Sequence, residues 1–547
     1  MKQEQWALHK KAVCSTGGVV AAQQVQAAAC GADVLANGGN AIDAAVAAGL
    51  MLGVTEPWMC GIGGSGYMVV WDAATQCARV FDFQGVLAQG IDPSDYPLDP
   101  LVPSNIMGFP GVVQNRNSEG YRSIAVPGAI KGFTEALNQF GSTGFDTLIQ
   151  PAILAAEQGV PVNWFTTLQI ALAAGTLLKD KAAQSLFLPG GVPLQPGETL
   201  KMPALAETMK SLAADGPDSL YRGATGERLV TDLRNGGCCI ELDDLLNYQV
   251  QQSATLDTVH RGVTIHTAGP TSGGPRLIES LDYVADNLDT SNAACEPGSG
   301  SWGVYAQALK KAWYGHNQKI GRSTEVGGCT SHLSTVDRHG NMVALTFTLL
   351  DRFGSGVLLP STGVLMNNAV SYFDPRPDHP TSMVGGKRIN ASNMCPVIAT
   401  RDRQSLFSLG ASGANYIVPC TTLITAMMLD FGLTLEQAIN APRLDVDGNG
   451  TVAADPRLGD DVIAELQRRC FEQCREQCDE HGDRQGALSC SEQNAGQGKV
   501  CRQVSMEPMQ VFPKRYACPS GVSRDPDSGL LCGISDPSHP FAGGVAV

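Results

Sequence analysis

The sequence predicts a layered α+β protein in which helices flank antiparallel strands. Apolar residues recur with helical spacing up to about residue 55 and again over 126–246. Short runs rich in Val, Phe and Thr alternate with polar turns, most clearly over 330–349. Hydrophobic residues make up 43% of the 547 residues and charged residues 17%, which supports a large core and excludes a disordered chain.

Two helices are predicted near the N-terminus, over 20–36 and 41–54. The first is rich in Ala and Gln with periodic Val and Leu, and an Asn-Gly-Gly turn ends it. Asn40 can cap the second helix, which is apolar nearly all round and is therefore expected to be buried. Capping, or a hydrogen bond to the next loop, explains Asp43 and Glu56 better than acid–base chemistry does.

The other elements follow along the chain. Residues 90–122 are rich in Pro, Gly, Asn and Ser and are expected to form a loop, and Pro442 ends a late helix. The segment 331–349 is expected to be a hairpin around a polar turn at 338–341. Further strands are predicted over 67–71, 78–83, 263–266 and 406–408, and helices over 126–246 and 417–430.

Composition excludes several classes of partner. The chain has 38 Lys and Arg against 53 Asp and Glu, a net charge of −15, so neither nucleic acid nor an anionic membrane is expected as a partner. No run approaches the ~18 apolar residues of a membrane span, and the N-terminus has no signal-peptide pattern. The 17 cysteines cannot all pair, and those in apolar runs are expected to be core hydrophobes of a protein from the reducing cytoplasm.

Three motifs have simple structural explanations. The run GIGGSG at 61–66 matches a dinucleotide-binding pattern, but a helix precedes it and a strand follows, so we expect a loop packed near a site and no cofactor. Ser65 lacks the strand that precedes a nucleophile elbow. Cys470, Cys474 and Cys478 share one helical face without a second pair of ligands, so the polar, Cys-rich segment 470–501 is interpreted as an insertion and no metal site is predicted.

The segment from Gly327 to His332 indicates more specific chemistry. It leads from a loop into a strand, with Thr330 at the opening of that strand. An N-terminal-nucleophile (Ntn) hydrolase is cut just before a Thr, Ser or Cys, whose side chain attacks while the freed α-amine acts as the base. Cys329 and Ser331 are alternative nucleophiles, and a threonine that merely starts a strand is the non-catalytic explanation.

Four motifs along the chain resemble those of the γ-glutamyltranspeptidase family. They are NGGNAIDAAVAAGLMLGVTEPWMCGIGGSGYMVVW at 37–71, VPGAIKGF at 126–133, TSHLSTVDRHGNMVALTFTL at 330–349 and AINAPR at 438–443. The resemblance implies the four-layered αββα sandwich of Ntn hydrolases. It also implies a precursor that cleaves itself into a large subunit, 1–329, and a small subunit, 330–547, which form one catalytic domain.

The resemblance also assigns the catalytic residues. Thr330 is the nucleophile, Thr348 matches the family's second threonine, which holds the nucleophile in place, and the chain is cut between Cys329 and Thr330. Gly413 and Ala414 match the family's paired glycines, whose N–H groups form the oxyanion hole. Alanine still has its N–H, so the hole can survive at Ala414.

The positions that bind a glutamyl group depart from the family pattern. Gln84 stands where the family has an arginine that grips the α-carboxylate, and an amide does not reproduce that bidentate contact. Arg352 and Arg388 are candidate replacements for this arginine. At the remaining positions, Leu350 stands where the family has an asparagine, and Ala369 and Tyr372 stand where it has the Gln and Asp that bind the α-amine. Ser392 and Asn393 stand where the family has a pair of serines.

The resemblance therefore implies a self-processing amidohydrolase or acyltransferase without a cofactor. Its substrate would be a small-molecule amide, γ-glutamyl-like or short-chain, and water or an amine would receive the acyl group. The chain resembles the cytoplasmic, oxamate amidohydrolase-like and cephalosporin acylase-like members. The alternatives are a true glutathione or γ-glutamyl hydrolase-transpeptidase with a rebuilt pocket, and an inactive metal-binding or scaffold homologue. The sequence leaves open whether the processed heterodimer forms a homo-oligomer.

Overall fold

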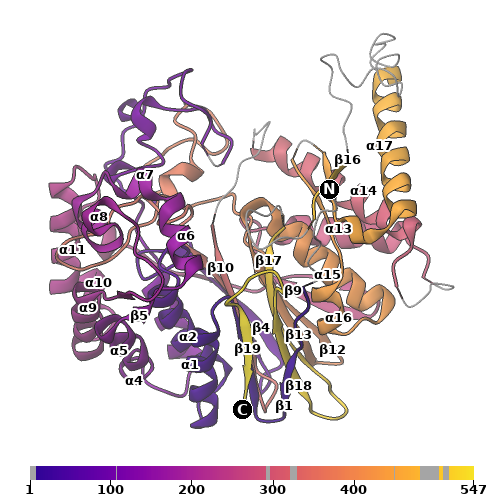
Figure 1. Ribbon diagram of the computed structural model, residues 1–547, viewed down its shortest axis with the longest axis horizontal. Helices are drawn as coiled ribbons and strands as arrows, with labels where there is room; N and C mark the ends of the chain where they lie inside the picture. Colours follow the sequence, from indigo (N-terminus) through magenta and orange to yellow (C-terminus); the bar gives the residue numbers. More distant parts are fainter. Residues whose placement is uncertain are drawn as a thin grey trace.

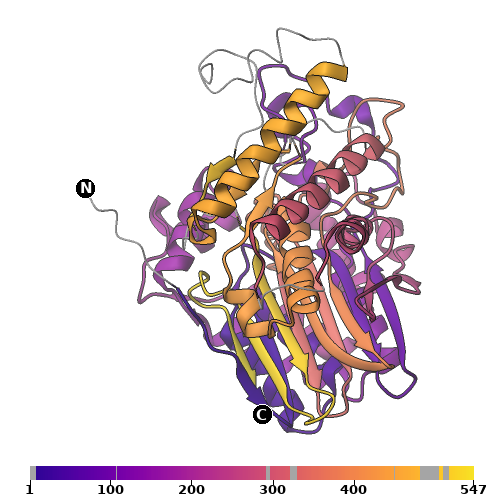
Figure 2. The same cartoon turned by 90° about the vertical axis from the view of Figure 1, so that its right-hand side faces the viewer.

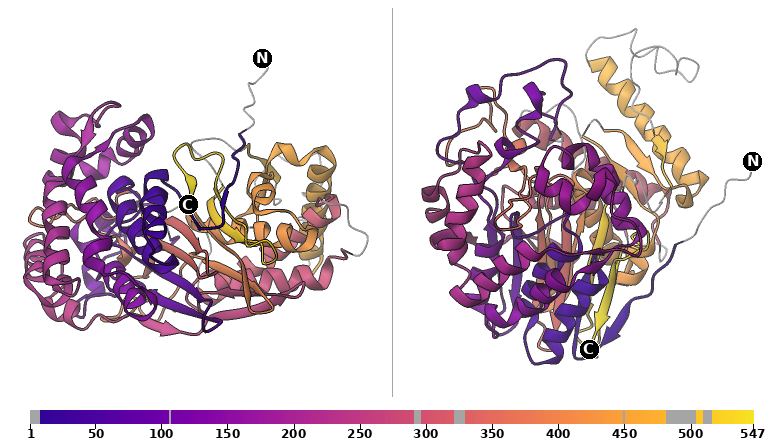
Figure 3. Two further views of the ribbon diagram at one scale, coloured as in Figure 1. Left: turned by 90° about the horizontal axis from the view of Figure 1, so that it is seen from below. Right: turned by 60° about the vertical axis from the view of Figure 1, so that its left-hand side comes forward.

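Two seven-stranded sheets lie face to face at the centre of the molecule, and helices cover the outer face of each (Figure 1, Figure 3). This confirms the α+β prediction and its αββα layers. The computed structural model describes residues 8–105, 107–290, 296–320, 329–448, 450–480, 504–508 and 516–547, and only the backbone of 471–480.

The first sheet contains the segment that carries the predicted nucleophile. Its strand order is β19-β2-β10-β11-β3-β4-β7, and its neighbours are antiparallel. Strands β10 and β11 form the predicted hairpin at its centre. The strands are β2 (Gly18–Ala22), β3 (Ser65–Asp72), β4 (Cys77–Phe83), β7 (Gln251–Ser253), β10 (Ser331–Asp337), β11 (Met342–Thr348) and β19 (Gly543–Ala546).

The second sheet packs against the first. Its order is β1-β18-β17-β13-β12-β9-β8, again antiparallel throughout. Its strands are β1 (Val13–Ser15), β8 (Leu256–His260), β9 (Val263–Thr267), β12 (Val397–Arg401), β13 (Gln404–Ser412), β17 (Cys518–Arg524) and β18 (Leu531–Ser535).

The helices form two groups. One group, from the first half of the chain, covers the sheet that contains β10, and the other, from the second half, covers the opposite sheet, with α14 and α17 outermost (Figure 1, Figure 2). The first group includes α1 (Val25–Ala36), α2 (Ala41–Thr55), α3 (Ala129–Phe140), α5 (Gln150–Gln158), α6 (Trp164–Leu172), α9 (Pro203–Asp215) and α11 (Ala224–Asn235). The second includes α13 (Gly274–Asn287), α14 (Ser299–Ile320), α15 (Ile417–Phe431), α16 (Leu435–Asn440) and α17 (Asp460–Glu480).

Helix α2 lies directly behind the nucleophile hairpin and is buried along its whole length. Asn40 caps it as predicted, and Asp43 completes a reciprocal capping box, so the structural explanation of Asp43 is confirmed. The carboxylate of Glu56, which follows the helix, lies 3.5 Å from His539 Nε2. The prediction of one helix over 20–36 is wrong at its start, because the first residues form strand β2 and helix α1 begins at Val25.

Strand β1 is tied to β18 by a disulfide between Cys14 and Cys532. The fold thus pairs two cysteines that are 518 positions apart, although the sequence favoured a reducing environment, where disulfides are rare. Cys470 is buried on helix α17, whereas the side chains of the other cysteines in the 470–501 segment lie outside the described residues. Within the described ranges, no helix is both long and apolar enough to cross a membrane.

Candidate active site

The peptide bond between Cys329 and Thr330 lies at the entrance to strand β10. Both residues are buried, with exposed fractions of 9% and 4%. The Thr330 hydroxyl donates a hydrogen bond to the Cys329 carbonyl oxygen at 2.7 Å, so Oγ1 is next to the carbonyl that it would attack. The geometry suits an attack within the chain, because the hydroxyl and the carbonyl are held together before any reaction begins.

Thr348, at the end of β11, holds the same carbonyl from a second side. Its hydroxyl donates to Cys329 O at 2.5 Å and accepts the N–H of Leu350 at 2.7 Å. The accepted bond orients the hydroxyl proton toward the carbonyl oxygen, where negative charge develops when a nucleophile attacks. In the uncut chain Thr348 therefore acts on the carbonyl of the peptide bond before Thr330.

The glycine-rich loop at 61–66 packs against this threonine, as the sequence predicted. A side chain at Gly64 would lie 2.5 Å from the Thr348 carbonyl oxygen, and one at Gly66 would lie 2.2 Å from Thr346 O. Glycine is therefore required at both positions for the loop to approach β11. Ser65 pairs with Thr348 across the β3–β11 ladder, so it has a structural role here.

Strand β10, which follows Thr330, packs against β13, which precedes the predicted oxyanion-hole residues Gly413 and Ala414. Across the interface, the Ser408 hydroxyl donates to Ser334 Oγ at 3.0 Å, and a side chain at Gly410 would collide with the His332 ring. Gly413 and Ala414 come directly after β13. Their φ values are 132° and 49°. Ala414 thus adopts a left-handed conformation that glycine adopts more easily, at a cost of about 1 kcal/mol.

His332 supports the nucleophile strand from inside the sandwich. Its ring nitrogens bond to Thr346 Oγ1 at 2.8 Å and to Ser334 Oγ at 3.0 Å. Complete burial lowers its pKa to about 3, because the charged imidazolium would lose its solvation. His332, two residues after Thr330, is therefore a neutral histidine that bonds to neighbouring hydroxyls within the sheet.

Gln84, Ser392 and Asn393 lie near one another at the edge of this site. The Gln84 side chain lies between Ser65 Oγ, at 3.5 Å, and Met394 Sδ, at 3.6 Å. The Asn393 amide bonds to the Asn415 side chain, which follows the predicted oxyanion hole. The structure therefore brings Gln84, which precedes β11 in the sequence, close to Ser392 and Asn393, which follow β11 and lie about 300 positions further along the chain.

Leu350, Ala369 and Tyr372 form the apolar side of the site. Their exposed fractions are 4%, 1% and 5%, and they belong to one buried hydrophobic cluster. Leu350 also joins the reacting segment, because its carbonyl oxygen accepts the N–H of Cys329 at 2.6 Å. These three positions, which depart from the family pattern, are thus connected to Cys329 through Leu350.

Neither arginine proposed as a substitute clamp points into the apolar side of the site. Arg388 Nη1 donates to the Gln84 carbonyl oxygen at 3.0 Å, and its guanidinium lies over the Tyr248 ring at 5.3 Å. Arg352 Nε donates to Gln169 Oε1 at 2.7 Å. Both cations bond to protein groups, and Arg352 also lines a pocket beside Asp351.

The geometry separates the three candidate nucleophiles. Burial raises the pKa of the Cys329 thiol to about 12, so this residue stays a thiol at neutral pH. Ser331 is the neighbour of Thr330 on a strand and points to the opposite face, where its hydroxyl interacts with the Cys60 thiol. Thr330 alone has its hydroxyl at the carbonyl.

Sequence reasoning missed two adjacent asparagines that organise the site. The Asn367 side chain bonds to the carbonyl oxygens of Gly63 and Ala125 at 2.8 and 3.0 Å, and Asn368 Oδ1 accepts the N–H of Asp351 at 3.1 Å. Through these bonds, two adjacent residues hold both the glycine-rich loop and the segment that follows Leu350 in place. The pair stands in the segment LMNNAVSYF at 365–373, but two adjacent asparagines by themselves do not reveal their partners.

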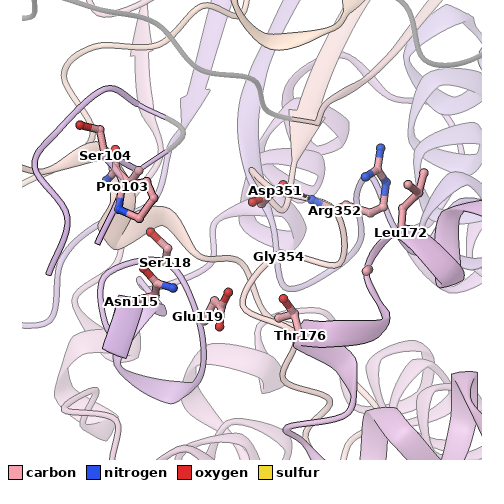
Figure 4. A pocket seen from close by; sticks show the side chains of 12 residues that line it. Pro103, Ser104, Asn115, Ser118, Glu119, Leu172, Thr176, Asp351, Arg352 and Gly354 are labelled. Atoms are coloured by element: carbon pink, nitrogen blue, oxygen red, sulfur yellow. Dashed lines mark hydrogen bonds between the residues drawn. The ribbon is translucent and has the colours of Figure 1, made fainter. Parts of the chain in front are cut away.

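A pocket of about 280 Å³ opens beside the loop that follows Leu350 (Figure 4). Asp351 and Arg352 lie on one side of it, and Ser118 and Glu119 come from the loop opposite. Burial raises the pKa of Asp351, partly offset by the Arg352 backbone and charge. This polar pocket, which the sequence did not predict, adjoins the reacting segment through Leu350.

Comparisons with known proteins agree with this geometry. The gamma-glutamyltranspeptidase family model matches residues 27–324 and 307–498. The acylase ACY 1 proenzyme of Pseudomonas sp. (strain SE83) is 31% identical over 479 residues, which cover 80% of this chain and 84% of that protein. The glutathione hydrolase proenzyme of Bacillus subtilis (strain 168) is 28% identical over 517 residues, covering 84% and 85%. The crystal structure of a cephalosporin acylase from Bacillus halodurans shares the fold, with a TM-score of 0.80, 22% identity and coverage of 100% and 99%.

The sandwich has the same fold as the cephalosporin acylase structure. The chain belongs to the gamma-glutamyltranspeptidase family. It is a self-processing amidohydrolase or acyltransferase, in agreement with the two sequence relatives, both of which are proenzymes.

Proposed function

We propose that Thr330 is the nucleophile and that the precursor cuts itself between Cys329 and Thr330. The products are a large subunit, 1–329, and a small subunit, 330–547. The observation that carries the proposal is the pair of hydroxyls on one carbonyl oxygen, Thr330 at 2.7 Å and Thr348 at 2.5 Å. Autocleavage gives each hydroxyl a chemical role at this carbonyl, one as the attacking group and the other as the donor to the oxyanion.

Cleavage proceeds in two steps. Thr330 Oγ1 attacks the Cys329 carbonyl carbon, its proton passes to the departing amide nitrogen, and the peptide bond is replaced by an ester. The Thr348 hydroxyl stabilises the negative charge on the carbonyl oxygen during this step. Water then hydrolyses the ester, which leaves a carboxylate on Cys329 and a free α-amine on Thr330.

In the mature enzyme the Thr330 α-amine takes the hydroxyl proton while Oγ1 attacks a substrate amide. The N–H groups of Gly413 and Ala414 stabilise the oxyanion, and the leaving amine takes up the proton. Water or a second amine then receives the acyl group from the Thr330 ester. The substrate is a small-molecule amide, and Gln84, Leu350, Ala369, Tyr372, Ser392 and Asn393 surround its acyl group.

A second candidate function is the hydrolysis or transpeptidation of glutathione and other γ-glutamyl compounds. The Bacillus subtilis relative, a glutathione hydrolase proenzyme, favours it. It requires a group that pairs with the α-carboxylate, and Gln84 is uncharged while Arg388 is bonded to the Gln84 carbonyl. An inactive scaffold is disfavoured by the two convergent hydroxyls at the Cys329 carbonyl.

The sequence favours a cytoplasmic location, and one feature of the structure opposes it. A homo-oligomer of the processed heterodimer is compatible with the fold. The Cys14–Cys532 disulfide argues for an oxidising environment, since the cytosol keeps most such pairs reduced. Cell fractionation of the tagged chain decides between the two locations.

N-terminal sequencing of the small fragment is the direct test of the proposed nucleophile. We expect Thr-Ser-His-Leu-Ser as the first residues, in a protein that hydrolyses amides. The Thr330→Ala variant should remain a single chain and be inactive. An uncut wild-type protein with full activity, or a small fragment that begins at Cys329 or Ser331, would refute the proposal.

A further inference from the structure

Cys329 occupies the position that a substrate's acyl group takes after maturation. In the precursor, the Thr330 hydroxyl faces the Cys329 carbonyl as it would later face a substrate carbonyl. The surroundings of Cys329 therefore indicate what kind of acyl group fits. The residue is 9% exposed, and burial raises its thiol pKa to about 12, as expected where a charged group is poorly solvated.

Leu350 forms the wall next to Cys329. Its carbonyl oxygen accepts the Cys329 N–H at 2.6 Å, so the two residues touch directly. Its side chain packs in the same buried cluster as Ala369 and Tyr372, with Met107 and Phe109 among the other members. Leu350 thus connects the backbone of Cys329 to this apolar cluster.

The backbone of Leu350 indicates that the apolar side chain is retained for a reason. Its φ is 85°, in a region that asparagine adopts readily and that strains a branched side chain such as leucine. Strained residues persist where the surrounding structure over-determines them, and they are frequent at active sites. Here the constraint is the bond from the Leu350 N–H to Thr348 on one side and the hydrophobic cluster on the other.

The cations nearest to this wall are already bound by protein groups. Arg388 is bonded to the Gln84 carbonyl oxygen, and Arg352 to a glutamine side chain. Arg276 donates to Asn393 Oδ1 at 2.6 Å and lies over an indole ring at 4.5 Å. A carboxylate carried to this wall would compete with these protein groups for a cation or lose its water without compensation.

From these contacts we infer that the acyl pocket selects an uncharged, largely apolar acyl group. The substrates are then amides of simple carboxylic acids, and Leu350, Ala369 and Tyr372 are the residues that determine this specificity. The inference rests on the proposed function, because it needs Thr330 to be the group that the acyl chain is transferred to.

Three p-nitroanilides of matched chain length test the inference on processed wild-type enzyme. Pentanoyl-p-nitroanilide is uncharged, the glutaryl compound adds a carboxylate, and the γ-glutamyl compound adds a carboxylate and an ammonium group. We expect kcat/KM for the pentanoyl compound to exceed that of each charged compound by about 100-fold or more, as for an uncompensated buried charge. Preference for either charged compound, or turnover of none of the three, would overturn the inference.

The Leu350→Asn variant tests the wall itself. Asparagine suits the φ of 85°, so the variant should still process, while kcat/KM for the pentanoyl compound falls about 10-fold or more. Leu101→Asn makes the same chemical change at a leucine that is 90% exposed and should match the wild type. Ala369→Gln, which inserts an amide into the same wall, is the second variant and should act in the same direction. Unchanged kinetics in both wall variants would contradict the assignment.

The same experiments separate the two proposals. Failure to process, or activity that survives Thr330→Ala, would refute the proposed function. Normal processing and Thr330-dependent turnover with a preference for γ-glutamyl or glutaryl amides would refute the acyl-group inference alone.

Discussion

Replacing Thr348 with valine removes one hydroxyl and changes little else in side-chain shape. The lost group donates to the Cys329 carbonyl oxygen at 2.5 Å and accepts the Leu350 N–H at 2.7 Å. A donor of this kind to a developing oxyanion contributes about 2.7–4 kcal/mol, so autocleavage of Thr348→Val should slow by about 100- to 1000-fold. The buried N–H of Leu350 also loses its acceptor, which should cost about 1–3 kcal/mol of stability.

The assay follows the fraction of uncut chain over time on denaturing gels, beginning with freshly purified precursor. Thr348→Ser is the matched control, because it restores the hydroxyl, and it should process within about 10-fold of the wild type. Thermal unfolding separates loss of chemistry from loss of fold. A folded Thr348→Val precursor that matures within about threefold of the wild-type rate would show that the hydroxyl does not stabilise the oxyanion.

Three further predictions follow from other parts of the structure. Thr330→Ser should still process, since it keeps the hydroxyl, whereas Thr330→Ala should yield only the full-length chain of 57.5 kDa on a reducing gel. On a gel without reductant, the processed wild type should run as one band near 57.5 kDa, and with reductant it should run as two bands. Cys14→Ser should give two bands on both gels. Two bands from the wild type without reductant would contradict the cross-link. The pKa of His332 is about 3 in the folded protein, so as the pH falls the unfolded chain takes up a proton at this histidine before the folded chain does. The contribution of His332 to stability is therefore complete above about pH 6.5. Below that pH the free energy of unfolding decreases, by up to about 1.4 kcal/mol per pH unit. His332→Gln should flatten the pH dependence of the unfolding free energy between about pH 6 and 4, and an unchanged slope would count against this origin.

Local patterns predicted much of the framework. The Asn40 cap, the buried helix behind it and the β10–β11 hairpin all depend on residues close in sequence, and each is confirmed. The error over 20–22 has a physical cause. These residues have helix-compatible composition, but pairing with β10 and β19 on either side makes them a central strand.

One part of the candidate site could likewise be predicted from the sequence, and another part could not. The motif around Thr330 and Thr348 could be found from sequence because both lie on one hairpin. The polar pocket beside Asp351 and the Cys14–Cys532 bond depend on segments that are far apart along the chain, which no local pattern specifies. The left-handed φ of Leu350 is likewise set by its neighbours, since leucine has no intrinsic preference for it.

The order of strands has a consequence for the two-fragment molecule that the proposed cut between Cys329 and Thr330 would produce. In both sheets, strands from before residue 329 alternate with or flank strands from after residue 330, and β2 lies between β10 and β19. Two fragments interleaved in this way cannot come apart without dismantling both sheets. Folding must therefore precede cleavage, and the cut molecule, once unfolded and reduced, must refold by a second-order reaction that slows on dilution. When the Cys14–Cys532 bond is intact, refolding stays first-order, because the disulfide keeps the two fragments covalently connected after the peptide bond is cut.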